Sequence, residues 1–335
     1  MNFLRSLIFL TYLSLFIFSC KTDNGNEKGA VTEVNTDVEN LDQALFSCKS
    51  VKDVQSFLHK HSYLVPLYFA DTQADTAQLA GHLFNILQNP DFQRFRNQVD
   101  SIIGNRETVI VTPLKKAFAQ IKHHYPDFKA PAIKFIMTGF TGNDLYISDS
   151  LIIIGLDYFG GPKASYRSDV FDYQLRKYQK EYIVPSIVFF MSNNYNHVKA
   201  GDASLLAEMI GYGKGYEFVK RILPNTPDSL ILGYSEDNLK RTYNSQQDIW
   251  SYFITSKLLY ENNELRKQKF IGERPFTTEI GNKVPGGIAR WFGWRIVKLF
   301  VKENPDMTLP ELMQKDNATT ILQESGYKGQ NDEEE

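Results

Sequence analysis

The hydrophobic pattern of this chain changes its period twice, and that change limits the fold to one class. In residues 41–126 apolar residues recur at the spacing of amphipathic helices, and the same spacing returns in residues 170–325. Between them, residues 132–159 hold short apolar runs separated by turn residues. These runs predict strands at Ala132–Met137, Asp144–Ile147 and Leu151–Ile154. Many helices beside a few short strands predict an α+β fold that is mostly helical, with a small sheet around residues 132–159.

Two segments are expected at the centre of this fold. Ile183–Asn193 is apolar on nearly all sides, which is typical of a helix buried in the middle of a protein. The continuous run Leu151–Ile154 indicates a strand that is buried on both faces. We therefore expect a buried central helix next to the small sheet.

The first 19 residues have the pattern of a bacterial secretory signal. Arg5 gives its positive start, and the apolar stretch Leu7–Phe18 is shorter than the about 20 residues that a membrane span needs. Ile17–Cys20 then resembles a lipobox, with an aliphatic residue three positions before the cysteine and a small residue directly before it. In lipoproteins of this kind the cysteine is diacylated, the signal is then removed, and the mature chain begins at that cysteine. We predict lipidation at Cys20; the alternative is an ordinary signal peptide followed by a chance cysteine.

The remaining chain is predicted to hold one domain between two solvated ends. Residues 20–40 are expected to be the lipidated cysteine and a flexible tether, because a polar segment of this kind cannot offset its ordering entropy. Residues 329–335 are expected to be a disordered acidic tail. Residues 41–328 have the length of a single large domain.

Composition argues against several classes of function. The formal net charge of −2 gives no electrostatic reason to expect a nucleic-acid partner. Only Cys48 is left once Cys20 carries lipid, so no intramolecular disulfide is expected. Residues 211–215 are glycine-rich but lie in a helical segment and lack the Lys-Ser/Thr pair of a phosphate loop, so close packing explains them better. No cofactor is expected.

No set of residues has the spacing of a familiar catalytic site. The chain has 6 histidines, and no two are four residues apart, as a zinc site on one helix requires. A Gly-x-Ser-x-Gly elbow is also missing from the sequence. Glu208 follows three apolar residues and is the carboxylate most expected to face inward. An active hydrolase that uses Glu208 with Asp157 or Asp248 stays open as an alternative.

Several short segments, in this order and spacing, resemble the gliding motility-associated lipoprotein GldB family of Bacteroidetes. The resemblance runs from the lipobox to about Lys328. The segments that carry it are Leu205–Ile210, Gly213–Lys214, Leu223–Asp228, Trp250–Tyr252, Phe270–Gly272, Pro275–Thr277, Pro285–Ile288 and Gly293–Val297.

That family in turn resembles predicted zinc-dependent proteases with a zincin-like fold, whose active-site helix carries His-Glu-x-x-His. Laid on this sequence, the motif falls on residues 189–193, where Phe189, Phe190 and Asn193 replace the two histidines and the glutamate. Phenylalanine has no lone pair for zinc and cannot take a proton from water. Glu208 corresponds at most to a leftover third ligand. The resemblance therefore implies a degenerate zincin-like scaffold with no metal and no catalysis.

The expected function is that of a membrane-anchored, non-catalytic binding or scaffolding protein of the gliding apparatus. A protease groove that has lost its metal can still bind an extended peptide along an edge strand. We expect Phe189 and Phe190 to fill the volume of the metal and its water. The residues nominated for the peptide-binding edge strand are Leu151, Ile153, Gly155, Asp157 and Phe159.

The expected partners are the membrane, through the lipid, and other envelope proteins of gliding motility or secretion. The expected location is the cell envelope, with the outer membrane favoured over the inner. Besides the active hydrolase, a purely structural envelope lipoprotein without a binding groove stays open as an alternative.

Overall fold

The structure, a computed structural model, describes residues 34–69 and 75–330. Its sheet has four strands in the order β1-β2-β4-β3, in which β1, β2 and β4 run parallel and β3 is antiparallel to β4. The three predicted strands are all present, within one or two residues of the predicted bounds. The strands are β1 (Val38–Asn40), β2 (Ala132–Ile136), β3 (Leu145–Ile147) and β4 (Leu151–Gly155).

The strand β1 corrects the predicted extent of the tether. Val38–Asn40 lies inside the segment expected to be flexible, yet it pairs with β2 from Val38 opposite Ile133 onward. Lys134 Nζ lies 2.6 Å from Asp37 Oδ2 and 2.9 Å from Glu39 Oε2, so ion pairs fix the same register. A short polar strand forms here because β2 offers an unpaired edge. Residues 1–33, with the signal sequence, Cys20 and the start of the tether, lie outside the described residues.

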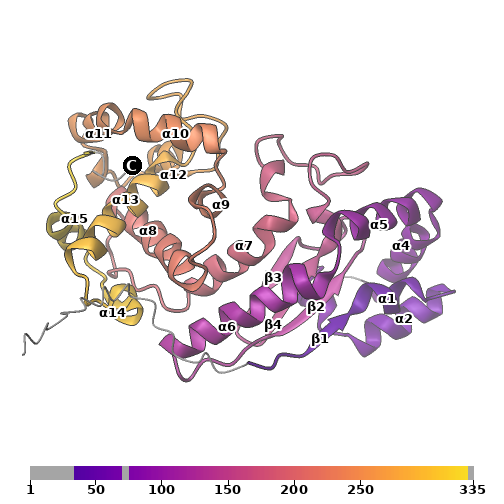
Figure 1. Cartoon of the computed structure of the whole chain (residues 1–335). Coiled ribbons are helices and arrows are strands. Elements are labelled where there is room, and N and C mark those ends of the chain that lie inside the picture. Colours follow the sequence, from indigo (N-terminus) through magenta and orange to yellow (C-terminus); the bar gives the residue numbers. More distant parts are fainter. Residues whose placement is uncertain (1–33, 70–74, 331–335) are drawn as a thin grey trace, which may run out of the picture. The chain divides into compact units, whose positions relative to one another are not determined.

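Of the helices that precede β2 in the chain, α1, α2, α4 and α5 lie beside one end of the sheet, while α6 runs along it (Figure 1). Local signals place their starts: the Ser50 side chain caps one helix, and Asn89 followed by Pro90 begins another. The helices are α1 (Leu41–Phe46), α2 (Val51–Lys60), α3 (Leu64–Leu67), α4 (Thr76–Gln88), α5 (Pro90–Ile103) and α6 (Thr112–His124), with the π-helix η1 (Glu107–Val111) before α6.

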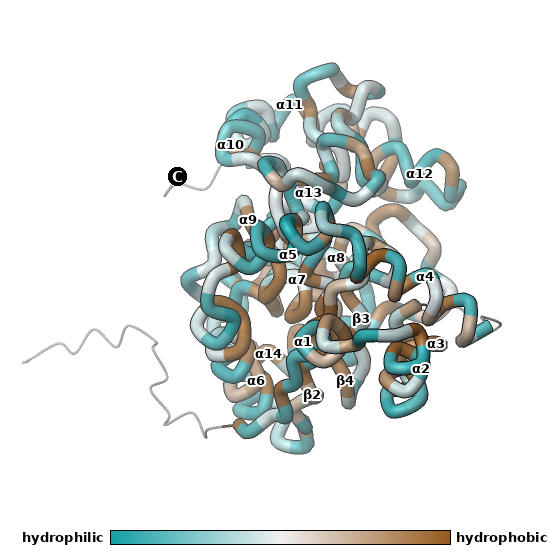
Figure 2. The backbone as a smooth tube through the Cα atoms, turned by 90° about the vertical axis from the view of Figure 1, so that its right-hand side faces the viewer, coloured by the Kyte–Doolittle hydropathy of each residue, from teal (hydrophilic) through white to brown (hydrophobic). Residues whose placement is uncertain are grey.

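The central helix is α7 (Lys180–Ser192), and it is buried as predicted. Ile183, Ile187 and Val188 have no exposed surface. The helix packs on β3 on one side and on α8 (Leu205–Ile222) and α9 (Asp228–Leu232) on the other. Figure 2 shows apolar residues concentrated in and around α7, while α10 (Glu236–Asn244) is largely hydrophilic.

The rest of the chain is helical and packs around α8 and α13. A break at Ser245 separates α10 from α11. The remaining helices are α11 (Gln246–Thr255), α12 (Glu264–Ile271), α13 (Ile288–Glu303), α14 (Leu309–Gln314) and α15 (Ala318–Ser325).

The glycine-rich run lies inside α8, as predicted, and it allows two helices to touch. A Cβ added at Gly213 would lie 2.3 Å from the carbonyl oxygen of Gly293, and one at Gly293 would lie 1.8 Å from that of Met209. The neighbouring Lys214 is buried, and its Nζ donates to the carbonyls of His197, Met313 and Lys315 at 2.5, 3.2 and 2.7 Å. The backbones of α8 and α13 are therefore in direct contact. The ammonium group of Lys214 also holds two neighbouring segments of the chain, one at His197 and one at Met313 and Lys315, against α8.

The end of the domain also differs from its predicted boundary. Gly329 is buried against Trp250, and the Gln330 side chain donates to the carbonyl of Gly326. Of the predicted disordered tail, Gly329 is therefore packed and the exposed Gln330 is hydrogen-bonded, while residues 331–335 lie outside the described part of the chain. Within the described ranges, none of the helices combines the length and the apolar content that a bilayer span requires.

Candidate functional site

The strand nominated for peptide binding is not an edge strand. β4, with Leu151, Ile153 and Gly155, lies between β2 and β3 and is paired on both sides. Asp157 and Phe159 follow it in the 3-10 turn η2 (Leu156–Phe159) and are only 1% and 2% exposed. The prediction was wrong because β3 pairs with β4 in antiparallel orientation. It occupies the edge of β4 that a peptide would need.

The neighbouring strand β3 is an edge strand, and β1 forms the opposite edge of the sheet. Gly155 N–H donates to Asp144 O at 2.8 Å, and Ser148 N–H donates to Leu151 O at 2.9 Å. Because hydrogen bonding alternates along an antiparallel strand, residues 144, 146 and 148 face β4. The backbone groups of Leu145 and Ile147 therefore point to the open side, where Asp144 Oδ1 accepts from the Leu145 N–H at 2.7 Å. The carbonyl of Leu145 and the N–H and carbonyl of Ile147 are therefore available to pair with a further strand.

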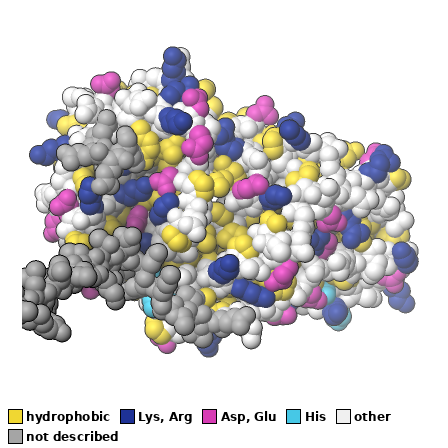
Figure 3. Space-filling model, viewed as in Figure 1, with side chains coloured by type: hydrophobic (Ala, Val, Ile, Leu, Met, Phe, Trp, Pro, Cys, Tyr) yellow, Lys and Arg dark blue, Asp and Glu magenta, His cyan; other side chains and the backbone are white. Residues whose placement is uncertain are grey.

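A groove of about 920 Å³ runs along this edge, between β3 and the end of α7. We call it the β3 groove. Its lining residues include Lys129, Leu145, Ile147, Asp149, Phe190 and Asn193. On the face shown in Figure 3, hydrophobic side chains gather in the middle of the view, where Figure 1 places α7, with charged side chains around them.

The two phenylalanines of the degenerate motif point in different directions. Phe190 is 52% exposed and lines the β3 groove, so the expectation that both rings fill a buried metal site is wrong for this residue. Phe189 is half-buried and stacks on Tyr212 and Tyr216, with ring centroids 6.1 and 5.0 Å away. The difference follows from helical geometry, since consecutive residues of α7 point about 100° apart.

The residues at the motif positions do not fit a zinc ion. Two phenyl rings and one amide at Phe189, Phe190 and Asn193 offer no imidazole or carboxylate ligand. In residues 34–69 and 75–330, no three His, Cys, Asp or Glu side chains come together in a way that could hold a metal.

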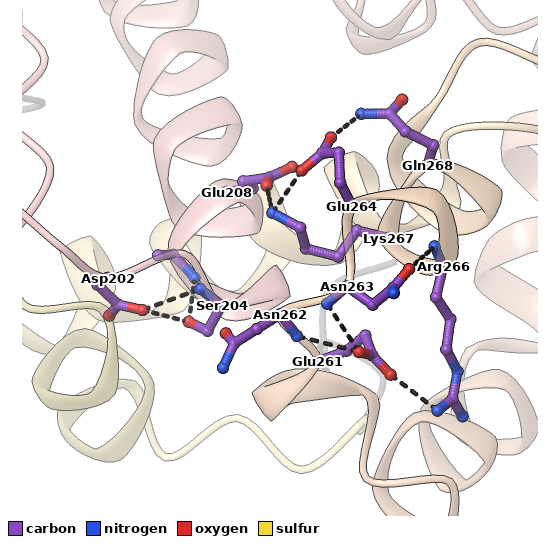
Figure 4. A network of polar contacts seen from close by, with 11 residues as sticks. Asp202, Ser204, Glu208, Glu261, Asn262, Asn263, Glu264, Arg266, Lys267 and Gln268 are labelled. Atoms are coloured by element: carbon purple, nitrogen blue, oxygen red, sulfur yellow. Dashed lines mark hydrogen bonds and ion pairs between the residues drawn. The ribbon is translucent and has the colours of Figure 1, made fainter.

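Glu208 is placed in an ion-pair network and not in a buried acid–base pair (Figure 4). Its carboxylate accepts from Lys267 Nζ, which also lies 2.9 Å from Glu264 Oε2. The Glu208 side chain keeps 30% of its surface exposed, while that of Lys267 keeps 3%. Glu208 therefore serves mainly to compensate a buried lysine. Asp248 is exposed on α11.

Asp157 is occupied by a backbone turn. Its Oδ2 accepts from the N–H groups of Thr138 and Phe140 at 3.1 and 2.7 Å. Burial raises the pKa of Asp157, although these N–H groups act in the opposite direction. Phe140 has a φ of 62°, a left-handed conformation that a non-glycine residue adopts at a cost. The carboxylate holds this strained turn in place and is not paired with Glu208.

A second cavity, of about 340 Å³, adjoins the β3 groove. We call it the tyrosine chamber, because Tyr178, Tyr182, Tyr212 and Tyr216 line it together with Phe189. Leu145 and Phe190 line both the chamber and the groove. Burial raises the pKa of Tyr216 to about 12, so its hydroxyl stays protonated at neutral pH.

Sequence reasoning missed this chamber, although one signal was available. Tyr212 and Tyr216 are four residues apart on α8, and on a helix this spacing puts two rings on one face. Tyr182 lies in the first turn of α7, while Tyr178 lies just before that helix. That all four rings face one cavity depends on how these segments pack against α8, which the spacing does not encode.

Residues 22–329 match the family described as "Gliding motility protein GldB". No curated protein and no solved structure gives a significant match. The predicted likeness to zincin-like proteases therefore stays a prediction.

Proposed function

The chain belongs to the gliding motility protein GldB family, and from that premise we propose that it is a non-catalytic, lipid-anchored protein that binds an extended peptide in the β3 groove. The family implies a role in gliding motility and a lipoprotein of the cell envelope. The observation that carries the finer proposal is the open edge of β3 beside the exposed Phe190.

Strand addition explains this combination of features. A peptide beside β3 pairs with the outward backbone groups of Leu145 and Ile147, which supplies affinity without regard to sequence. Every second side chain of the peptide then faces the groove wall, where Phe190 gives an apolar contact.

The non-catalytic part of the proposal is supported by the residues at the motif positions. Phe189, Phe190 and Asn193 cannot supply the ligands or the general base of a metalloprotease. The carboxylates of the alternative hydrolase are otherwise engaged, Glu208 with Lys267 and Asp157 with a backbone turn. The partner would be another envelope protein of motility or secretion, held at the membrane by the lipid on Cys20.

The groove is tested with peptides selected from a displayed library of random decapeptides. The change Ile147→Pro removes the outward N–H and puts a ring on the edge, while Ile147→Val keeps the backbone donor. Phe190→Ala removes the aromatic wall of the groove, and Tyr260→Ala removes an aromatic residue elsewhere that is 68% exposed, against 52% for Phe190. Measured by fluorescence anisotropy, Ile147→Pro and Phe190→Ala should each weaken binding about tenfold. Ile147→Val and Tyr260→Ala should leave it within about twofold.

The proposal fails if every selected peptide binds the two groove variants as well as the unchanged protein. In cells, the same groove variants should stop gliding while the protein remains folded and in the membrane fraction. Full gliding by both variants would favour the purely structural lipoprotein.

Two further measurements test the rest of the proposal. Metal analysis and a general peptidase assay on the purified protein should give neither stoichiometric metal nor turnover, and either result would favour the active hydrolase. Cys20→Ala should move the protein out of the membrane fraction, because one lost lipid anchor removes the acyl chains together. Retention of the variant would show that something other than lipid holds it.

A further inference from the structure

A third cavity adjoins the tyrosine chamber, and its lining carries more positive than negative charge. It measures about 100 Å³, and we call it the basic pocket. Lys177, Tyr216, Glu273 and Arg290 line both it and the tyrosine chamber. The β3 groove, the tyrosine chamber and the basic pocket thus follow one another, each sharing lining residues with the next.

Positive charge exceeds negative charge in the basic pocket. Its charged lining residues are Arg176, Lys177, Arg274 and Arg290 on the positive side and Glu273 alone on the negative side. Lys177 Nζ lies 2.8 Å from Glu273 Oε1, and Arg274 Nη1 lies 2.9 Å from Glu279 Oε2, outside the lining. Two carboxylates against four cations leave two positive charges in excess. A confined, positively charged cavity attracts an anion.

Arg290 is held in place by uncharged groups. Its Nε donates to the carbonyl of Ile271 at 2.5 Å, and its guanidinium carbon lies 4.4 Å from the centroid of the Tyr212 ring. Burial lowers the pKa of Arg290, but Tyr216, Tyr212 and Glu273 outweigh it, so the net shift is upward and the group stays charged. A fixed guanidinium loses little entropy when it binds a planar carboxylate.

We infer that the basic pocket binds a carboxylate of the peptide ligand and that an apolar or aromatic side chain next to this carboxylate enters the tyrosine chamber. The pocket has room for a group of that size, and the chamber supplies aromatic walls with protonated hydroxyls. The carboxylate comes from the C-terminus of the peptide or from an acidic side chain. This inference rests on the proposed function for its ligand, but small molecules can test it separately.

The test uses three probes, each of which contains one phenylalanine side chain. N-acetyl-phenylalanine carries a terminal carboxylate, N-acetyl-aspartyl-phenylalaninamide carries a side-chain carboxylate, and N-acetyl-phenylalaninamide carries none. By calorimetric titration, at least one acid should bind about tenfold more tightly than the neutral amide. The stronger of the two acids identifies the source of the carboxylate. Equal binding by all three probes would overturn the inference.

Matched variants locate the binding. Lys177→Gln and Arg290→Gln should each remove the preference for the acid, while Lys302→Gln, an exposed lysine on α13, should keep it. Arg290 is largely buried, so its variant is first checked by thermal unfolding. The Lys177 side chain is 36% exposed, so Lys177→Gln is expected to fold. It provides the test if Arg290→Gln unfolds. An unchanged preference in Lys177→Gln would overturn the inference.

The two proposals can fail separately. The small probes are too short to pair along β3, so their binding should survive Ile147→Pro. If the decapeptides ignore Ile147→Pro but the probes depend on Lys177, the groove proposal falls and the carboxylate site stands. If the decapeptides depend on Ile147 but the probes show no preference for the acid, the groove stands and the carboxylate site falls.

Discussion

At the α8–α13 crossing two backbones touch at Gly213 and Gly293, whereas along the β3 groove the backbone of Leu145 and Ile147 has no neighbouring strand. The crossing is closed to any added atom. The groove keeps unpaired backbone groups and an exposed ring at Phe190. The helices α7 and α8 therefore belong to a core with two different sides. The side toward α13 is tightly packed, and the side toward β3 is open to a ligand. Substitutions should therefore cost stability at the crossing and binding at the groove.

The largest loss of stability is expected from Gly293→Ala. The added Cβ would lie 1.8 Å from the carbonyl oxygen of Met209, so the two helices must separate. We expect the free energy of unfolding to fall by about 3 kcal/mol or more in urea denaturation. The control is Gly211→Ala on α8, where the nearest atom is Val198 Cγ2 at 3.7 Å. That change should raise stability by about 0.5–1 kcal/mol, and equal effects would contradict the tight crossing.

A smaller loss, with a characteristic pH dependence, is expected from Lys214→Met. The change leaves one buried and two partly buried carbonyls without their shared donor and should cost about 2 kcal/mol at neutral pH. Burial lowers the pKa of Lys214 from 10.5 to about 8 in the folded protein. Between these values the unfolded chain binds more protons than the folded one, so stability rises with pH in this window.

The advantage of the unchanged protein over Lys214→Met should therefore grow by up to about 3 kcal/mol from pH 8 to pH 10.5. Urea denaturation at several pH values measures it. Lys302→Met, which removes an exposed lysine, should change stability by less than about 0.5 kcal/mol at pH 7. A constant difference between the unchanged protein and Lys214→Met across this range would contradict the prediction.

The adjacent phenylalanines separate stability from binding. Phe189→Ala loses the stacking on Tyr212 and Tyr216 and should cost about 2 kcal/mol. Phe190→Ala removes a ring that is 52% exposed and should cost less than about 1 kcal/mol while it abolishes gliding. Thermal unfolding and a spreading assay on agar measure the two effects. Loss of stability by Phe190→Ala as large as that by Phe189→Ala would erase the distinction between core and groove.

The smallest effect is expected at the other edge of the sheet. Asp37→Asn weakens the ion pair with Lys134, but the Asp37 side chain is 72% exposed and Glu39 remains as a second partner. The free energy of unfolding should fall by less than about 0.5 kcal/mol, and less at high salt. A loss above about 1 kcal/mol would mean that β1 depends on this charge.

Patterns of a few neighbouring residues predicted the strands β2, β3 and β4, nearly with their observed bounds, and the buried helix α7. The strand β1 was not predicted, because Val38–Asn40 has no strand pattern of its own and becomes a strand only beside β2. The break at Ser245 between α10 and α11 is likewise not indicated by the helical period alone.

One part of the candidate site was indicated by the sequence and another was misplaced. Phe190 and Asn193, which stand at the degenerate motif positions, line the β3 groove. Leu151–Phe159 was assigned to an edge because a buried run does not reveal which strand lies outside it. The tyrosine chamber and the basic pocket were not anticipated.

The sequence by itself determined which segments are helix or strand and which chemical groups stand at each position, because both depend on neighbours a few residues away. Only the tertiary structure decided that β4 is internal and β3 open, and that Lys177, Glu273 and Arg290 share one pocket. Strand order and the meeting of side chains from distant segments depend on pairing and packing across the whole chain, which a local pattern does not specify.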